Sequence, residues 1–153
     1  MAMDKAFFDT WTPRALAVLR IVLAYLMIQH GTAKLFHIPH VEMFDTLQPF
    51  TLAWFAGLIE LVGGALLLVG FFTRFTAFIL SGEMAFAYFI AHASQGSPLM
   101  PMLNHGELAV VYCFVFLLMA AAGAGTWSLD SRLTGPEYAP LRRRSDEMAH
   151  HRA

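Results

Sequence analysis

The chain has 153 residues, of which 58% are hydrophobic and only 14% are charged. A soluble domain of this length usually contains about 45–50% apolar and roughly 25% charged residues, so the composition argues against a soluble protein. The net charge of −1 supplies no positive field, which excludes a nucleic-acid-binding module. The single cysteine, Cys113, excludes an internal disulfide, a C-x-x-C redox centre and any cysteine-ligated zinc or iron–sulfur site.

Four long apolar segments follow one another along the chain and hold nearly all of the hydrophobic excess. They cover about residues 13–36, 52–72, 75–93 and 107–123. At about 1.5 Å per residue, each has a length suited to a hydrocarbon core of ~30 Å, and none shows the alternation of a β-barrel strand. We predict an all-α fold, a four-helix transmembrane bundle of antiparallel helices, with one domain over residues 1–133 and a polar cytoplasmic tail over residues 134–153.

The first segment is predicted to begin at Pro13. Thr12 is a residue type that caps helices, and proline is favoured at the first helical position. No cleavage motif of small residues follows the segment, so we expect a retained helix rather than a signal peptide. Phe7, Phe8 and Trp11, just before it, are typical of an aromatic anchor at a membrane interface.

The distribution of basic residues predicts the orientation in the membrane. Eight of the ten lysines and arginines lie before or at the very start of the first segment, between the second and third, or after the fourth. The positive-inside rule therefore places both termini in the cytoplasm, and the loops over residues 37–51 and 94–106 on the outer side.

Four charged residues lie within or at the edge of the apolar segments: Arg20, Glu60, Glu83 and Glu107. A charge at mid-bilayer costs at least about 2.5–3.5 kcal/mol, which makes each of them a functional candidate. The alternative interpretation is that these charges pair between helices and fix their register without any chemistry. Glu83 points away from the polar stripe that holds His92, so the predicted site leaves Glu83 out.

Glu60 lies on a face of small residues in the second segment, and small residues let helix backbones approach closely. The other members of this face are Ala53, Ala56, Gly57, Gly63 and Gly64. We therefore expect Glu60 to be buried, where its carboxyl must be protonated or paired with a base. Arg20 and Lys34 share a stripe of the first segment and are the candidate partners. Their depths predict one interior site of Arg20 and Glu60, with Lys34 pairing further out with histidines or Glu107.

Histidines and carboxylates gather on the predicted outer side. They are His30, His37, His40, Glu42, His92, His105 and Glu107. Imidazole and carboxylate groups can ligate zinc, iron or copper, and paired histidines can ligate haem. Because no recognised ligand spacing is present, we predict neither a metal site nor haem. Cys113 is expected to be a packing residue, since desolvation suppresses its thiolate.

Several motifs in these segments are distinctive. They are Arg20…His30-Gly31-x-x-Lys34, Gly57-x-x-Glu60, Gly63-Gly64, Gly70-x-x-Thr73-Arg74, Ala87, His92, Glu107, Tyr112, Gly123-x-Gly125 and Ser128-Leu-Asp130. Together they resemble the DoxX family of small bacterial membrane proteins over about residues 14–133. The resemblance implies a multi-pass protein of the bacterial inner (plasma) membrane. It also implies quinone-linked redox chemistry, as in the membrane part of a thiosulfate:quinone oxidoreductase, or a place in an oxidative-stress complex.

We interpret the chain as a membrane subunit or accessory of such chemistry that binds a quinone-like hydrophobic molecule between its helices. The expected partners are the lipid bilayer, a quinone and a soluble redox protein. The candidate ligand-binding residues are Arg20, His30, Lys34, Glu60, His92, Glu107 and Tyr112, and the candidate catalytic residues among them are Glu60, Arg20, His30 and His92. Two alternatives remain open: a proton-coupled small-molecule transporter, and a non-catalytic membrane adaptor for a soluble oxidoreductase.

The predicted topology can be tested with reporter fusions. A periplasm-active reporter fused after Arg132 is expected to stay silent, and one inserted near Gln48 is expected to be active, because most basic residues lie on the side of Arg132. The opposite pattern of activity would contradict the orientation.

Overall fold

The computed structural model describes residues 5–134, and every regular element in this range is helical. The α-helices are α1 (Lys5–Phe36), α2 (Leu52–Val69), α3 (Thr73–Ala87), α4 (Glu107–Ala122) and α5 (Leu129–Thr134). A π-helical turn, Tyr88–His92, and a 3₁₀ turn, Ala93–Gln95, continue α3, and a further 3₁₀ turn covers Glu42–Phe44. The all-α prediction is confirmed for the described range. Residues 135–153, which hold almost all of the predicted tail, lie outside it.

Three helical segments are long and apolar enough to cross a membrane: Lys5–Phe36, Leu52–Val69 and Thr73–Gln95. The fourth, α4, is apolar but has only 16 residues, or about 24 Å. Large apolar side chains such as Phe75, Phe78 and Phe114 are more than half exposed on the helix surfaces. Apolar surface of this extent is typical of a protein that faces lipid rather than water.

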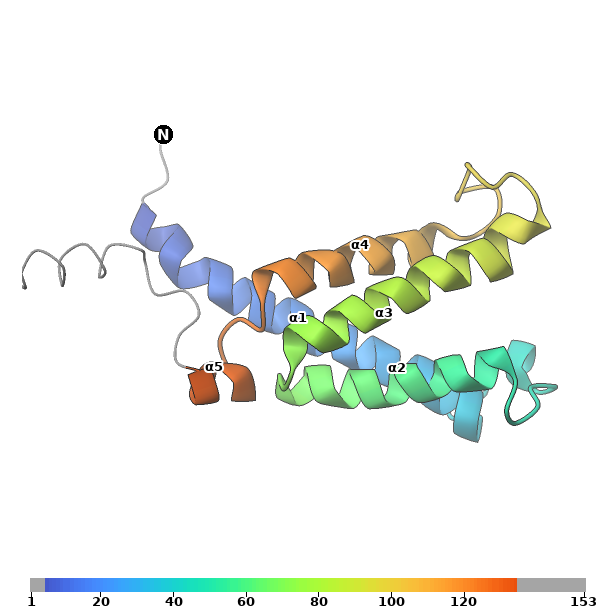
Figure 1. The fold of residues 1–153 in the computed structure, drawn as a ribbon, viewed down its shortest axis with the longest axis horizontal. Coiled ribbons are helices and arrows are strands. Elements are labelled where there is room, and N and C mark those ends of the chain that lie inside the picture. The colour runs from blue at the N-terminus through green and yellow to red at the C-terminus, as the bar shows by residue number, and fades with distance from the viewer. Residues whose placement is uncertain (1–4, 135–153) are drawn as a thin grey trace, which may run out of the picture.

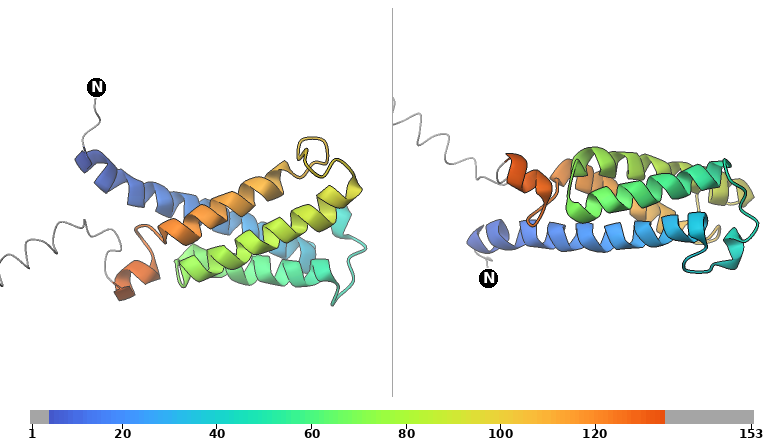
Figure 2. Two further views of the ribbon diagram at one scale, coloured as in Figure 1. Left: turned by 45° about the horizontal axis from the view of Figure 1, so that its top comes forward. Right: turned by 90° about the horizontal axis from the view of Figure 1, so that it is seen from below.

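The helices form two pairs. In Figures 1 and 2, α1 lies along α2 and α3 lies along α4, and the packing within each pair is closer than the packing between the pairs. The pairs meet through a shared core of buried side chains. This core consists of Leu23, Ala24, Met27, Leu67, Ala77, Leu80, Met84, Tyr112, Phe116 and Met119. We refer to the end that holds the 37–51 and 96–106 connections as the loop end, and to the opposite end, where α5 lies, as the α5 end.

The predicted start of the first helix is wrong, because α1 begins at Lys5 and Pro13 lies inside it. A proline inside a helix removes one backbone hydrogen bond. Here Pro13 is buried, and its carbonyl accepts a hydrogen bond from the Thr126 amide at 3.1 Å. The chain after α4 therefore packs against α1 at the proline, and the helix continues through it.

Arg20 ties three parts of the chain together at the α5 end. Its side chain is 0% exposed and donates to four backbone carbonyls, those of Leu67, Leu68, Ala124 and Trp127. The carbonyls of Leu67 and Leu68 belong to the last turn of α2, where a cation is favoured, and the Leu67 carbonyl also accepts from the Gly70 amide at 3.0 Å. This group of contacts, which we call the arginine anchor, joins α1, the end of α2 and the segment after α4.

Asp130 completes the same end of the molecule. Its carboxylate oxygens accept hydrogen bonds from the amides of Phe72 at 2.9 Å and Thr73 at 2.8 Å, and so cap the start of α3. The turn before α3 needs Gly70, which has a φ of +69°. A side chain at Gly70 would lie 2.4 Å from Ser128 Cβ and 2.8 Å from an Arg20 nitrogen. The residues after α4 therefore close this end of the fold.

The loop end is held by polar contacts around the π-helical turn. The Tyr88 hydroxyl donates to the carbonyl of Pro98 at 2.8 Å and accepts from the Asn104 side chain at 3.2 Å. Nδ1 of His92 lies 3.1 Å from the Asn104 carbonyl oxygen. A side chain at Gly106 would lie 2.6 Å from the Tyr88 ring, so glycine is needed for this close approach.

The arginine anchor leads to a prediction about the stability of the fold. Arg20→Met is expected to lower the free energy of unfolding by about 3 kcal/mol, because it removes the charged donor from four carbonyls, two of them in buried and two in partly buried hydrogen bonds. Arg14→Met is the matched control, since Arg14 is exposed and its guanidinium lies over the Trp11 ring, 5.1 Å from the ring centroid. The free energies of unfolding of both variants are measured by unfolding in mixed micelles with an increasing fraction of dodecyl sulfate. Equal, small effects of the two substitutions would contradict the role of Arg20.

Candidate functional site

Each of the helices α1 to α4 contributes a polar side chain to one interior region toward the loop end. These side chains, which we call the charged cluster, are His30 and Lys34 of α1, Glu60 of α2, Glu83 of α3 and Tyr112 of α4. His30 and Glu83 both interact electrostatically with Lys34 and with Glu60. The rings of His30 and Tyr112 meet edge to face, with their centroids 6.3 Å apart.

A buried ion pair lies at the centre of the cluster. Nζ of Lys34 is 2.7 Å from each carboxylate oxygen of Glu60, and the two side chains are 14% and 3% exposed. The predicted burial of Glu60 is confirmed. The predicted pairing of Glu60 with Arg20 is wrong, because Arg20 binds backbone carbonyls at the α5 end. The predicted pairing of Lys34 with outer histidines or Glu107 is also wrong.

Two glycines explain why Lys34 can reach Glu60. A side chain at Gly31 would lie 2.7 Å from the Gly57 carbonyl oxygen and 2.6 Å from the Leu61 amide nitrogen. A side chain at Gly57 would lie 2.8 Å from Lys34 Cβ. The backbones of α1 and α2 therefore touch beside the ion pair, which places the base of the lysine side chain directly over the second helix.

Glu83 is the member of the cluster that the sequence interpretation left out of the site. Both of its carboxylate oxygens are enclosed, and neither has a hydrogen-bond partner within residues 5–134. An ionised carboxylate in such a position costs several kcal/mol, so this group must carry a proton or bond to something that enters the site. The signal in the sequence that identifies Glu83 is its charge within an apolar segment.

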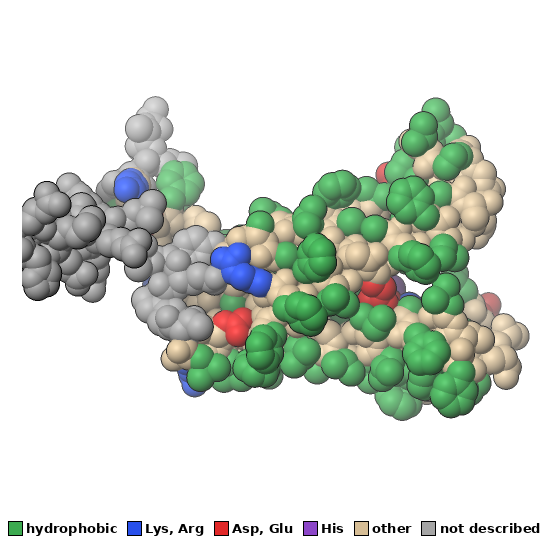
Figure 3. Space-filling model, in the orientation of Figure 1, with side chains coloured by type: hydrophobic (Ala, Val, Ile, Leu, Met, Phe, Trp, Pro, Cys, Tyr) green, Lys and Arg blue, Asp and Glu red, His purple; other side chains and the backbone are tan. Residues whose placement is uncertain are grey.

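The cluster lies where the two helix pairs diverge. The space-filling view shows acidic, histidine and basic side chains at the inner end of a cleft between α2 and α3 (Figure 3). The cleft widens toward the loop end, and hydrophobic side chains line both of its outer edges. At the α5 end, the arginine anchor and Asp130 hold the helices together. The cluster is therefore reached from the loop end and from the side, between α2 and α3.

Three of the predicted site residues lie outside the cluster. Arg20 belongs to the arginine anchor, and His92 contacts the Asn104 carbonyl in the loop-end network. Glu107 is exposed at the first position of α4. The predicted site residues that the structure brings together are thus His30, Lys34, Glu60 and Tyr112.

The outer histidines make separate local contacts. Nε2 of His40 lies 2.8 Å from an oxygen of Asp45, and Nε2 of His37 lies 3.2 Å from the Phe44 carbonyl oxygen. In the described part of the chain, no three histidine, cysteine, aspartate or glutamate side chains form a group that could hold a metal ion. Cys113 is partly buried against the core, with its sulfur 3.6 Å from the Ser81 hydroxyl.

The Lys34–Glu60 ion pair leads to a second prediction about the stability of the fold. Lys34→Met is expected to lower the free energy of unfolding by about 3 kcal/mol, because it leaves a buried carboxylate without its partner. Adding Glu60→Gln to Lys34→Met is expected to recover part of this loss. The exposed His40–Asp45 pair is the matched control, and Asp45→Asn is expected to have little effect. If the double variant loses as much free energy of unfolding as Lys34→Met and Glu60→Gln lose together, the two side chains are not coupled and the prediction is contradicted.

Comparison with known proteins agrees with the motifs in the sequence. The DoxX family matches residues 15–93, a range that includes His30, Lys34, Glu60 and Glu83. A Haemophilus influenzae protein described as an uncharacterized protein is 46% identical over 129 residues, which are 81% of this chain and 94% of the relative. No solved structure gives a significant match. The family match over half of the chain and the closeness of this relative show that the chain belongs to the DoxX family.

Proposed function

We propose that the chain is a multi-pass protein of the bacterial inner membrane that binds a quinone-like molecule in the charged cluster and exchanges protons with it. In this proposal it is the membrane subunit or accessory of a redox system, and a soluble partner supplies or takes the electrons. Both termini face the cytoplasm, as the basic residues predict. The observation that carries the proposal is the enclosed carboxyl of Glu83, which has no hydrogen-bond partner among residues 5–134, beside the Lys34–Glu60 ion pair.

The charge balance of the cluster supports a site that takes up protons. Two carboxyl groups, Glu60 and Glu83, face a single ammonium group, Lys34. If both carboxyl groups were ionised, the cluster would hold a net negative charge in an apolar surrounding. A proton that is shared or exchanged among the two carboxyls and His30 removes this charge, and histidine is suited to passing such a proton on.

The chemical groups of the cluster fit a neutral head group that carries carbonyl or hydroxyl oxygens. Lys34 and the Tyr112 hydroxyl can donate hydrogen bonds to a carbonyl, and Glu83 can accept one from a hydroxyl. Reduction of a quinone to its quinol consumes two electrons and two protons. The residues of this chain supply no electron carrier of their own in the proposal. Their part is to bind and orient the head group and to deliver protons from Glu83 and His30.

The two alternatives from the sequence make different demands on the structure. A proton-coupled transporter needs access to the cluster from both sides of the membrane, whereas the arginine anchor closes the α5 end. This closure favours a binding site over a pathway through the protein. A purely structural adaptor needs no unpartnered carboxyl in its interior, and Glu83 therefore favours a binding role.

The proposal predicts proton exchange that depends on Glu83. When decyl-benzoquinone binds to the purified protein in nanodiscs, the wild type is expected to change the pH of a weakly buffered solution, as followed with an indicator dye. Glu83→Gln is expected to abolish this change while the protein remains folded, because the amide cannot exchange a proton. Glu107→Gln is the matched control, since it makes the same substitution at an exposed position outside the cluster. Equal signals from wild type and Glu83→Gln would contradict the proposal.

A further inference from the structure

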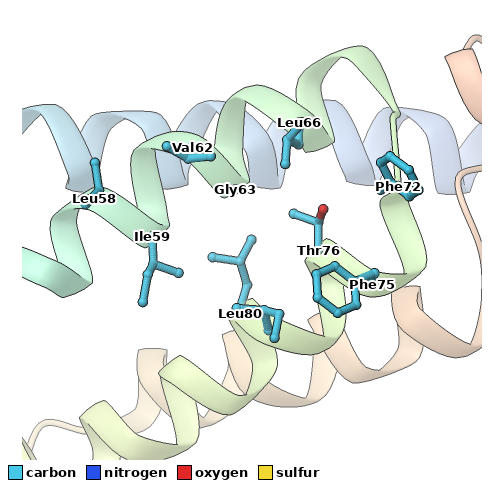
Figure 4. Close-up of a pocket in the computed structure, with 10 residues that line it drawn as sticks. Leu58, Ile59, Val62, Gly63, Leu66, Phe72, Phe75, Thr76 and Leu80 are labelled. Carbon is cyan, nitrogen blue, oxygen red and sulfur yellow. The ribbon is translucent and has the colours of Figure 1, made fainter.

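A groove with a volume of about 440 Å³ lies between α2 and α3 on the outer surface of the molecule (Figure 4). Ile59 of α2 and Leu80 of α3 point into the same space, and the Leu80 side chain packs against Gly63. Leu80 is fully buried in its floor, whereas Val62 on its wall is 50% exposed. The other lining residues are Leu58, Leu66, Phe72, Phe75, Thr76 and Ile79. At ~1.5 Å per residue, the α2 wall extends about 12 Å along the helix.

The loop-end side of the groove lies within one helical turn of two residues of the charged cluster. Glu60 follows Ile59 directly in α2, and Glu83 lies one helical turn beyond Leu80 in α3. The helices touch where a side chain at Gly63 would lie 3.1 Å from the Leu80 side chain. The next turn of each helix toward the loop end carries the carboxyl groups. The space-filling view agrees, because acidic atoms are visible between α2 and α3 with hydrophobic side chains on both sides (Figure 3).

We propose that the ligand of the charged cluster is an amphiphile, with a neutral head group in the cluster and an apolar chain that leaves between α2 and α3 and lies in the groove. This inference rests on the proposed function, because the head group is the one that the cluster binds. It adds the chain, its path and the residues that select for it. A head group without a chain would fill only part of the site.

The charges of the cluster decide which amphiphile fits. With Glu83 protonated the cluster is neutral, so the phosphate of a phospholipid would bring an uncompensated negative charge into an apolar surrounding. A head group with carbonyl and hydroxyl oxygens carries no charge and can bond to Lys34, Glu83 and Tyr112. The occupant is therefore a prenyl or alkyl quinone or quinol, and ordinary lipid is excluded by its head group rather than by its chain.

The test is photolabelling of the full-length protein in phosphatidylcholine nanodiscs. The probe is a benzoquinone whose decyl chain ends in a diazirine. Its adducts are expected on the groove walls of α2 and α3, and an excess of decyl-benzoquinone without the diazirine is expected to prevent them. Val62→Trp fills the groove from a half-exposed position and is expected to lower the labelling roughly fivefold. The factor is modest because a chain that leaves lipid gains packing rather than burial from water.

Leu68→Trp is the matched control, since Leu68 is 44% exposed on the same helix but does not line the groove. It is expected to leave the labelling unchanged. Adducts spread evenly over the lipid-facing side chains of α1 and α4, or equal losses with the two tryptophan substitutions, would overturn the groove as the chain site. A phosphatidylcholine probe with the same diazirine that labels the groove and is not displaced by decyl-benzoquinone would overturn it too, because ordinary lipid would then be the occupant.

A benzoquinone without a chain separates this inference from the proposed function. If it binds to wild type and not to Glu83→Gln, while the groove is not labelled, the proposed function stands and the chain site is wrong. If the groove is labelled equally in wild type, Glu60→Gln and Glu83→Gln, the chain site stands without its head group, and the proposed function is wrong. Absence of both binding and labelling would overturn the two together.

Discussion

The guanidinium of Arg20 is the interaction on which the arrangement of the helices depends. A buried arginine is stable only when its donors are used, and the carbonyls at the end of α2 and after α4 are stable only when they find donors. Each therefore satisfies the other, and four bonds fix α1, α2 and the chain after α4 at one point. Because the helix pairs are joined at the α5 end, they can diverge at the loop end, and the cleft that holds the charged cluster is a consequence of this arrangement.

Close contact between the backbones of α1 and α2 determines where the second set of buried charges, the Lys34–Glu60 ion pair, lies. Apolar side chains gain little from association within lipid, so helices in a membrane approach through small residues and polar contacts. Gly31 and Gly57 bring α1 and α2 into contact, and the Lys34–Glu60 pair lies beside that contact. Packing and electrostatics therefore support each other, since the ion pair needs the short distance and the short distance would be costly for an unpaired charge.

The sequence predicted the positions of the helices better than the partners of the buried charged side chains. Runs of apolar residues located the four long segments, and the small-residue face of α2 correctly predicted that Glu60 is buried. Depth along straight, parallel helices then assigned Arg20 to Glu60. Depth along a helix does not reveal backbone carbonyls as acceptors, and two of those that Arg20 uses, Ala124 and Trp127, lie after the last apolar segment. Glu83 was left out because a helical wheel gives directions within one helix and not the direction of its neighbours.

The two sets of buried charges differ in a way that separates structure from function. The carbonyls around Arg20 are fixed dipoles, and no change in protonation alters their contacts, so Arg20 has one state. Lys34, Glu60 and Glu83 are all titratable, and the carboxyl of Glu83 has no hydrogen-bond partner among the described residues. A group whose contacts are complete can only hold the fold together, whereas a group whose contacts are incomplete can respond to a proton or a ligand. The charge that the structure leaves unsatisfied, rather than the charge buried most deeply, is therefore the better guide to where this protein acts.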